Sequence, residues 1–502
     1  MKFLKLLDGS EVLAEQGNPD IFGLDYDSRR VQPGWCFVAM RGSTTDGNRY
    51  IDAAVTAGAV AVVSDSMPPR GGIAWAQVTR GRRALARLSA NFYKRPAERL
   101  SIVGITGTNG KTTTTFLVNA MLRSDGRKSA LLGTVEYRVG DDIIPSPHTT
   151  PEALELNQIF ARALDAGCTD AVMEVSSHAL EQERIYGIPF DVAVFTNLTR
   201  DHLDYHATME NYFVSKARLF QGTGIEPPRT AILNVEDEYG KQLVQLCKGR
   251  QDVVTYGVEQ GDFRAKDLSI GANGSRFTLV MPDEEIPLWT PLLGRVNVYN
   301  VIAAAAAASA RGVGANAISR ATSQLTCVAG RFERVDAGQP FTVIVDYAHT
   351  DDALRNLTSV AREFLAQRGS SGRVLTVFGC GGDRDRTKRP LMGEAAGRGS
   401  DFVVLTSDNP RSESPIDIIH DALPGLQRSG TRYTLEPDRR KAIALAVQDA
   451  QAGDIVLIAG KGHEKVQITR DGATPFDDIE VARKALLVAG YGAPEATEVA
   501  GS

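Results

Sequence analysis

The chain has 502 residues, of which 43% are hydrophobic and 23% charged, and its formal net charge is −5. Its length exceeds what a single hydrophobic core supports, so we expect about three domains. The acidic balance excludes a general attraction to nucleic acid, and five scattered cysteines without a CxxC pair argue against a disulfide framework or a cysteine-based zinc site.

No apolar run approaches the roughly 20 residues that a membrane-spanning helix needs. The longest is the alanine-rich run 301–310, and the apolar start of the chain meets Asp8 too early for a signal peptide. We therefore expect a cytoplasmic protein with unpaired thiols, no membrane association and no nucleic-acid partner.

Residues 1–97 are predicted to form a small N-terminal α/β domain. Short β-type runs alternate with helical stretches, and Lys94-Arg95-Pro96 ends the last helix. The expected strands are Trp35–Ala39, Ala59–Ser64 and Ile73–Thr79, and the expected helices are Ile51–Gly58 and Arg82–Tyr93.

Residues 98–330 are predicted to form a central ATP-binding domain. Apolar strands alternate with helices, which is typical of a mainly parallel sheet covered on both faces. Val298–Arg311 is an expected alanine-rich helix, and Gly330-Arg331 is a candidate hinge. The expected strands are Leu100–Ile105, Ala171–Val175, Val192–Thr196 and Thr230–Asn234.

The strongest local signal is a phosphate-binding loop that follows the first of these strands. Gly107 and Gly110 allow backbone N–H groups to approach a phosphate, and Lys111 opens a helix whose N-terminus favours anions. Thr112 or Thr113 can offer a hydroxyl to Mg²⁺. The weaker alternative is a glycine-rich turn that carries a lysine by chance.

Acidic and imidazole side chains follow the next strands. Glu174 ends an apolar strand, where burial is costly unless the carboxylate meets a partner such as Mg²⁺. The loop after Val192–Thr196 holds Asp201, His202, Asp204 and His206. A second cation or a phosphate contact explains this loop better than zinc, and a capped polar loop remains the main alternative for His206.

Residues 331–502 are predicted to form a Rossmann-like C-terminal domain. Its expected strands are Phe341–Asp346, Arg373–Phe378, Phe402–Thr406 and Ile455–Ala459. The loops 379–386 and 407–413 each combine arginine with aspartate beside glycine or proline. Arginine pairs with carboxylates and aspartate receives an ammonium, so together the loops suit a zwitterionic amino acid. Each loop alone would be an ordinary capped turn.

Nine segments, in this order and spacing, resemble the Mur ligases. They read GITGTNGKTTT, MEVSSHALEQER, TNLTRDHLDYH, GRVNVYN, AGRFE, VDYAHTDDAL, GCGGDRDRTKRP, SDNPRSESP and AGKGHE. The resemblance runs from about Asp25 to Gln467. It implies three domains, an acyl-phosphate intermediate, ATP and Mg²⁺ as cofactors, and a carbamylated lysine.

The resemblance assigns the nucleotide and metal sites. Catalytic roles fall to Lys111, Glu174, His202 and Lys216, with Lys216 carrying the carbamate, although its surroundings in the sequence would indicate a surface lysine. The implied ATP contacts are Gly107, Thr108, Asn109, Gly110, Lys111, Thr112, Thr113, Asn297, Asn300, Arg331 and Asp346. The implied metal ligands are Thr112, Glu174, His202 and the Lys216 carbamate.

The resemblance also implies two small-molecule substrates and a monomer. The implied contacts to a UDP-muramoyl dipeptide are Tyr26, Ser28, Ser43, Thr44, Thr45, His148, Thr149, Thr150, Ser176, Gln182 and Arg184. Those to meso-diaminopimelate are Arg384, Asp408, Asn409, Pro410, Arg411, Gly460 and Glu464. Arg411 can pair with the carboxylate that lysine lacks, which would reject lysine.

Three alternatives remain open at this point. The chain could add L-lysine or belong to another Mur or folylpolyglutamate-type ligase, because these enzymes share the ATPase core. It could also be a nucleotide-binding regulator without catalysis, against which the set Lys111, Glu174, His202 and Lys216 argues.

Overall fold

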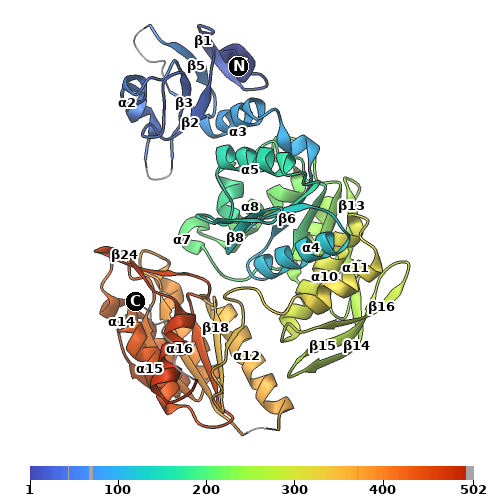
Figure 1. The fold of residues 1–502 in the computed structure, drawn as a ribbon, viewed down its shortest axis with the longest axis vertical. Helices are drawn as coiled ribbons and strands as arrows, with labels where there is room; N and C mark the ends of the chain where they lie inside the picture. The colour runs from blue at the N-terminus through green and yellow to red at the C-terminus, as the bar shows by residue number, and fades with distance from the viewer. Residues whose placement is uncertain (43–44, 67–71, 370, 493–502) are drawn as a thin grey trace, which may run out of the picture.

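The computed structural model describes residues 1–42, 45–66, 72–369 and 371–492. They form three α/β bodies that follow one another along the long axis of the molecule, with the N-terminal body at one end (Figure 1). The sheets of all three bodies are mainly parallel, which confirms the predicted fold class. Within the described ranges, no helix has the length and apolar character needed to cross a membrane.

The N-terminal body is a five-stranded sheet with the order β1-β5-β4-β3-β2. Only the β1–β5 pair is antiparallel among its neighbouring strands. The strands are β1 (Val12–Gln16), β2 (Gly23–Asp25), β3 (Trp35–Ala39), β4 (Ala61–Ser64) and β5 (Ala74–Val78). The helices are α1 (Phe3–Leu6), η1 (Gly47–Tyr50), α2 (Ile51–Thr56), α3 (Gly81–Phe92) and η2 (Pro96–Arg99).

The central body has an eight-stranded sheet with the order β13-β12-β11-β6-β10-β7-β8-β9, parallel except for the hairpin pairs at β8. The strands are β6 (Ser101–Thr106), β7 (Ser129–Leu132), β8 (Glu136–Val139), β9 (Asp142–Pro145), β10 (Asp170–Glu174), β11 (Val192–Phe195), β12 (Thr230–Asn234) and β13 (Asp252–Tyr256). The helices are α4 (Lys111–Ser124), α5 (Ala153–Asp165), α6 (Ser177–Glu181), α7 (Leu203–His206), α8 (Met209–Gln221), α9 (Glu238–Cys247), α10 (Arg295–Ala310) and α11 (Ala315–Gln324).

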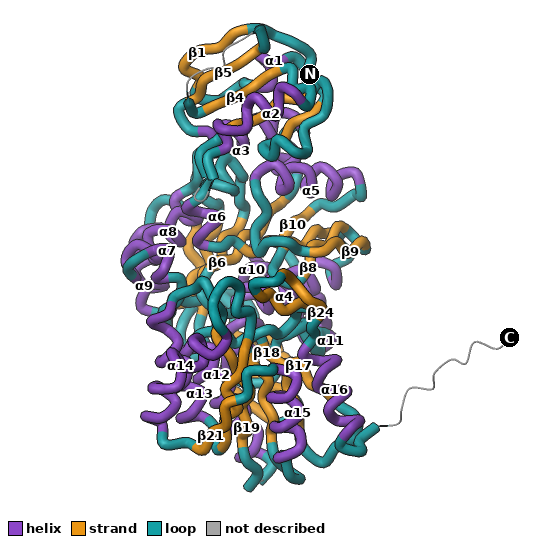
Figure 2. The backbone as a smooth tube through the Cα atoms, turned by 90° about the vertical axis from the view of Figure 1, so that its left-hand side faces the viewer, coloured by secondary structure: helices purple, strands orange, loops and turns teal. Residues whose placement is uncertain are grey.

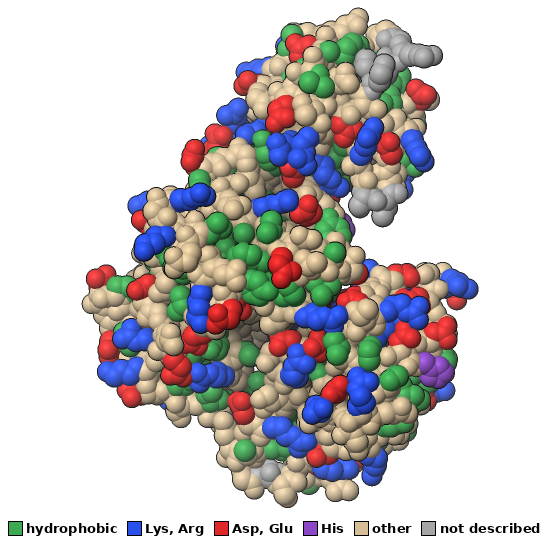
Figure 3. Space-filling view, turned by 180° about the vertical axis from the view of Figure 1, so that it is seen from behind, with side chains coloured by type: hydrophobic (Ala, Val, Ile, Leu, Met, Phe, Trp, Pro, Cys, Tyr) green, Lys and Arg blue, Asp and Glu red, His purple; other side chains and the backbone are tan. Residues whose placement is uncertain are grey.

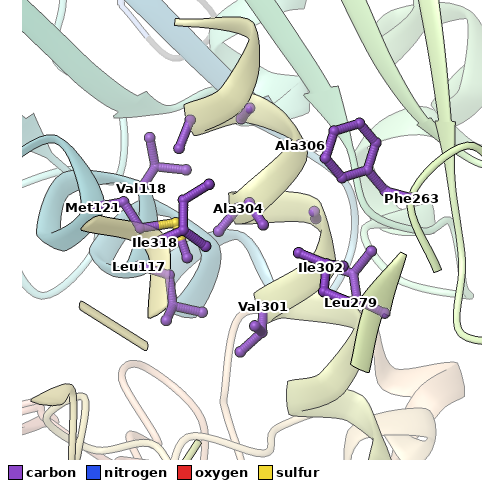
Figure 4. Close-up of a cluster of buried hydrophobic side chains, with 14 of the residues drawn as sticks. Leu117, Val118, Met121, Phe263, Leu279, Val301, Ile302, Ala304, Ala306 and Ile318 are labelled. Atoms are coloured by element: carbon purple, nitrogen blue, oxygen red, sulfur yellow. The ribbon is translucent and has the colours of Figure 1, made fainter. Parts of the chain in front are cut away.

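Helix α10 lies in the middle of the central core. Its alanines from 303 to 308 are all fully or almost fully buried, because small side chains let the helix approach α4 and the sheet closely. Figure 4 shows Val301 and Ile302 of α10 among Leu117, Met121 and Leu279. A separate antiparallel sheet packs beside this region and consists of β14 (Arg264–Gly271), β15 (Gly274–Val280) and β16 (Glu285–Thr290).

The C-terminal body has a six-stranded sheet with the order β17-β18-β22-β19-β20-β21, in which β17 is antiparallel, and a separate β23–β24 hairpin. The strands are β17 (Glu333–Val335), β18 (Thr342–Asp346), β19 (Val374–Cys380), β20 (Phe402–Ser407), β21 (Arg432–Leu435), β22 (Ile455–Ala459), β23 (Val466–Thr469) and β24 (Gly472–Pro475). The helices are α12 (Asp351–Gln367), η3 (Arg386–Lys388), α13 (Arg389–Gly399), α14 (Pro415–Ser429), α15 (Arg439–Asp449) and α16 (Asp478–Val488).

Helices cover both faces of the C-terminal sheet, as the tube view shows for α12, α13, α15 and α16 (Figure 2). The loops after its strands face the loops after the central strands. Arg200 after β11 donates to Thr387 at 2.8 Å, and Asn109 after β6 donates to Asp352 at 2.9 Å. The space-filling view shows the surface hollowed between the N-terminal and C-terminal bodies (Figure 3).

Candidate active site

The predicted phosphate loop lies between the end of β6 and the start of α4. Gly107 has φ +147°, and a Cβ there would lie 1.9 Å from Thr196 Oγ1, so only glycine fits this close approach. Lys111 begins α4 as predicted, and its Nζ donates to the carbonyls of Gly107 at 2.9 Å and Thr108 at 2.8 Å. Desolvation lowers the pKa of Lys111, although the negative charge of Glu174 acts in the other direction and raises it.

Glu174 is a buried carboxylate at the end of β10, 1% exposed. It accepts hydrogen bonds from Thr112 Oγ1 at 3.1 Å, Thr134 N at 2.8 Å and Thr134 Oγ1 at 3.0 Å. Glu174 was predicted from its position at the end of a strand, and the structure places it beside the phosphate loop. Thr134 was missed because it follows β7 in a stretch without a recognisable motif.

Lys216 is buried, which corrects the surface position that its sequence surroundings indicated. It lies on α8 with 1% exposure, because the helix turns this face toward the phosphate loop. Its Nζ donates to Gly107 O at 2.8 Å and lies 4.6 Å from the centroid of the Tyr212 ring. Desolvation, and then the charge of Lys111, lowers the pKa of Lys216 well below its usual range.

His202 lies in a group of rings around the start of α7. Its φ is +53°, and its Nε2 is 3.3 Å from Asp201 Oδ2. The His178 ring packs edge-on against it at 4.8 Å. Desolvation is the largest cause that lowers the pKa of His202, to about 3, so the imidazole is neutral and can act as a ligand. Across the described residues, no three histidine, cysteine or acidic side chains converge as a metal cluster.

His206 makes a hydrogen bond, which fits the capped polar loop that was the main alternative for this residue, and its ring also packs against a neighbour. It is buried, stacks on Tyr212 with ring centroids 4.9 Å apart, and its Nε2 is 2.9 Å from Ser177 Oγ. Desolvation, followed by the charges of His178 and Lys216, lowers its pKa to about 4.

Replacing His206 by glutamine should make stability less sensitive to acid. The pKa of His206 is about 4 in the folded protein and about 6.5 in the unfolded chain, so its stabilisation is complete above 6.5 and is lost as the pH falls toward 4. Thermal melts between pH 7 and 4.5 should show a decline shallower by up to about 1.4 kcal/mol per pH unit in H206Q. H420Q, at an exposed histidine, is the control, and equal slopes in both variants would contradict the assignment.

A cavity of about 490 Å³ opens between the central and C-terminal bodies. Arg331 reaches into it, donates to Thr112 Oγ1 at 3.1 Å and lies over the Tyr347 ring at 4.6 Å. Most of the predicted ATP and metal residues line this cavity. They are Thr108, Asn109, Gly110, Lys111, Thr112, Thr113, Glu174, His202, Asn297, Asn300, Arg331 and Asp346. It also includes residues that the sequence analysis did not single out, among them Tyr347, His349, Asp352 and Asn356.

Two of the predicted ATP and metal residues, Gly107 and Lys216, lie outside this lining. The hydrogen bond from Lys216 to the Gly107 carbonyl places Lys216 directly against the phosphate loop. Asp346, at the end of β18, accepts from Phe332 N at 2.7 Å and thereby fixes the chain that carries Arg331. The motif VDYAHTDDAL contained the signal for Tyr347, His349 and Asp352, since these three residues lie within it.

The predicted amino-acid residues come together at the carboxyl ends of β19, β20 and β22. Asn409 donates to Glu464 Oε2 at 2.7 Å. Lys461, which was missed, is fully buried and donates to both Asn409 Oδ1 at 2.9 Å and Glu464 Oε2 at 3.1 Å. Asp408 lies against Gly460, where a Cβ would be 2.5 Å from Asp408 Oδ2.

Arg411 follows Asn409 in the same loop and lies near Arg384, since both side chains approach Gly381. Its Nη1 donates to Gly382 O at 2.8 Å, and its φ is +53°. Desolvation, and then the charge of Arg384, lowers the pKa of Arg411. Pro410 joins Asn409 to Arg411 in the same loop. Two neighbouring guanidinium groups form a natural site for a carboxylate.

The residues predicted for the UDP-linked substrate fall into two groups. Five of them lie near the end of β10. Four of these contact one another or Glu174, as in the hydrogen bond from Thr150 Oγ1 to Glu174 O at 2.9 Å, and Thr149 contacts Thr134. These five are Thr149, Thr150, Ser176, Gln182 and Arg184. Tyr26 and Ser28 lie in the N-terminal body, where Tyr26 donates to Glu155 of α5 at 3.0 Å.

His148 and Thr45 are exposed. The His148 side chain therefore lies at the surface, while its carbonyl accepts from the Tyr137 hydroxyl. Ser43 and Thr44 lie outside the described residues.

Comparison with protein families places three known domains along the chain. The Mur ligase middle domain matches residues 105–308, the Mur ligase glutamate ligase domain matches 330–462, and the Mur ligase family catalytic domain matches 20–93.

Similar proteins cover nearly the whole chain. A UDP-N-acetylmuramoyl-L-alanyl-D-glutamate--2,6-diaminopimelate ligase of Solibacter usitatus is 50% identical over 95% of this chain and 96% of its own length. The enzyme of that name from Geobacillus thermodenitrificans is 46% identical over 94% and 96%. A solved structure with that name is 36% identical, has a TM-score of 0.64 and covers 94% of this chain and 96% of its own.

Proposed function

Because the chain belongs to the Mur ligase family, we propose that it is the ADP-forming ligase that adds meso-diaminopimelate to UDP-N-acetylmuramoyl-L-alanyl-D-glutamate in peptidoglycan synthesis. The observation that carries this proposal is a single cavity where Lys111, Glu174 and Arg331 meet, bordered by the body that holds Arg411. Such a site places a nucleotide's terminal phosphate between two other substrates.

The first step joins a carboxylate to phosphate. The γ-carboxylate of the bound D-glutamate attacks the γ-phosphorus of ATP, a P–O bond forms, and ADP leaves with the electron pair of the broken bond. Lys111 and Arg331 neutralise the charge that develops on the transferred group, because both cations are fixed before the reaction begins.

The second step forms the amide. The amine of diaminopimelate attacks the carbonyl carbon of the acyl phosphate. The C–N bond forms, phosphate leaves with the electron pair of the broken C–O bond, and the proton released from nitrogen passes to solvent. Asn409 and Glu464 are held together by buried Lys461, so the acceptors for an ammonium group are fixed before the substrate binds. Contacts such as Arg200 to Thr387 bring the bodies together and help to exclude water from the acyl phosphate.

The donor set fits Mg²⁺, which would polarise the γ-phosphate when bound. Glu174 and Thr112 supply a buried carboxylate and a hydroxyl already in contact, and neutral His202 supplies an imidazole nitrogen. Lys216 fits the carbamate proposal, because burial lowers its pKa and so favours the uncharged amine, the form that reacts with carbon dioxide to gain two oxygen donors. ATP would contact Gly107 to Thr113, Asn297, Asn300, Arg331 and Asp346.

We also propose the division of labour among the three bodies. Residues 1–97 bind the UDP end, residues 98–330 bind ATP, and residues 331–502 present the amino acid. The enzyme acts as a monomer in the cytoplasm, and its five free cysteines, four of them buried, fit a reducing compartment.

Activity with matched substrates tests the proposal. ADP release should occur with the UDP-muramoyl dipeptide plus meso-diaminopimelate, and should fall roughly a hundredfold or more with L-lysine, which leaves Arg411 unpaired. Equal use of lysine would favour a lysine-adding enzyme, and use of glutamate with a folate would favour a folylpolyglutamate synthetase. ATP binding without ADP release with each of these pairs would favour a regulator.

A further inference from the structure

Arg439 is a fully buried arginine beneath the proposed amino-acid site. It begins α15 and pairs with Asp478, the first residue of α16, with Nε–Oδ1 at 2.8 Å and Nη2–Oδ2 at 2.6 Å. Both side chains have 0% exposure. A buried ion pair loses so much hydration that apolar residues of equal volume often give a more stable protein. Stability alone therefore does not account for a charged pair at this point.

The rest of the guanidinium contacts the ends of two strands. Arg439 Nη2 donates to Ala459 O at 3.0 Å, and Nη1 donates to Ser407 O at 3.4 Å. Ala459 ends β22 and Ser407 ends β20, and β19 lies between these strands. The residues that follow directly are Gly460 and Asp408. One planar group thus holds the starting points of two amino-acid-binding loops.

The two loops approach each other directly above this group. A Cβ at Gly460 would lie 2.5 Å from Asp408 Oδ2 and 3.9 Å from Arg439 Nη2. Desolvation lowers the pKa of Arg439, but the charges of Asp478, Asp408 and Glu464 outweigh it and raise the pKa, so the arginine lies within electrostatic reach of a carboxylate from each loop. A shift of either strand end would change the spacing of Asp408 and Glu464.

We propose that Arg439, held by Asp478, is a positioning residue that sets the distance between the two loops of the amino-acid site. The inference rests on the proposed function, because it concerns how diaminopimelate is held. Arginine suits this role since its planar fork donates in several fixed directions at once, whereas the ammonium of lysine does not match the same acceptors.

The test compares substrates in the variant R439K. The KM for diaminopimelate should rise about tenfold or more, because small displacements of binding groups have large effects on productive geometry. The KM values for ATP and the UDP-muramoyl dipeptide should stay within about twofold. In the absence of amino acid, hydroxylamine should trap the acyl phosphate as a hydroxamate at the wild-type rate, because the first step does not use these loops.

D454N is the matched control at the opposite end of the same sheet. Asp454 is 3% exposed, pairs with Arg373 at 2.7 Å and precedes the start of β22. D454N should lower the melting temperature and leave the KM for diaminopimelate unchanged. D478N is the second variant at the proposed site and should reproduce the R439K pattern.

Two outcomes would overturn the inference. In one, all three KM values rise together or none rises in R439K and D478N. In the other, neither variant is folded at the assay temperature, which would make the pair structural. A wild-type protein that forms neither hydroxamate nor ADP would instead refute the proposed function, so the two failures are distinguishable.

Discussion

Replacing Lys216 by methionine is expected to lower kcat roughly a thousandfold while leaving the protein folded. Loss of one preorganised electrostatic group in an active site costs about 10²–10³ in kcat, and loss of a carbamate would also remove a metal ligand. Methionine has a similar length and needs no hydrogen bond, so the buried position between Gly107 and Tyr212 tolerates it. Steady-state ADP release and a thermal melt measure the two effects.

Carbon-13 NMR with labelled bicarbonate gives an independent reading of the same change. A carbamate signal should be present in the wild-type protein and absent in K216M. K241M, at an exposed lysine on α9, is the control and should retain both the signal and the activity. An active wild-type enzyme without the signal would contradict the carbamate, and K216M within tenfold of wild-type kcat would contradict its catalytic role.

Replacing Arg411 by alanine should lower kcat/KM for diaminopimelate roughly a hundredfold, mainly through KM. Hydrogen bonds to charged groups contribute about 1.5–3 kcal/mol each, and the second carboxylate would lose a bidentate partner. The KM for ATP should not change, because Arg411 lies in the loop after β20 and outside the lining of the nucleotide cavity. Initial rates with varied diaminopimelate, lysine and ATP separate these effects.

The ratio of kcat/KM for diaminopimelate to kcat/KM for lysine tests the role of Arg411 more directly than either value alone. It should largely disappear in R411A, since lysine never used the lost contact. R386A is the matched control, because Arg386 also lies beside the amino-acid loops but pairs with Asp421 at 2.9 Å and is mostly exposed. Unchanged selectivity in R411A would refute the role assigned to this arginine.

Much of the fold can be predicted from the spacing of apolar residues and from the glycine and proline residues that end helices and strands. The strands at Trp35–Ala39, Thr230–Asn234 and Ile455–Ala459 were predicted with the ends they have. The alanine-rich helix was predicted from Val298 and begins at Arg295, because Arg295 and Asn297 interrupt the apolar pattern in its first turn. Edge strands such as β1 escaped prediction since their side chains are mostly exposed and lack alternation.

Candidate site residues could be predicted from the residues alone only where a polar or charged side chain lies directly at the end of a strand or of the loop that follows it. Glu174 and Lys111 were found from the residues alone, because each lies at the junction of a buried strand or loop with a helix. The burial of Lys216 depends on how α8 packs against the phosphate loop, which is a contact across 109 positions of the chain. Lys461 and Asn409 lie 52 positions apart, and no local pattern reveals such a pair.

The hydrogen bonds from Asn109 to Asp352 and from Arg331 to Thr112 join the phosphate loop to the C-terminal body. A ligand that tightens this boundary changes the affinity of its neighbour, and thermodynamic reciprocity makes the factor equal in both directions. Diaminopimelate that binds the C-terminal body and tightens this boundary would therefore raise the affinity for nucleotide by the same factor by which nucleotide raises the affinity for diaminopimelate.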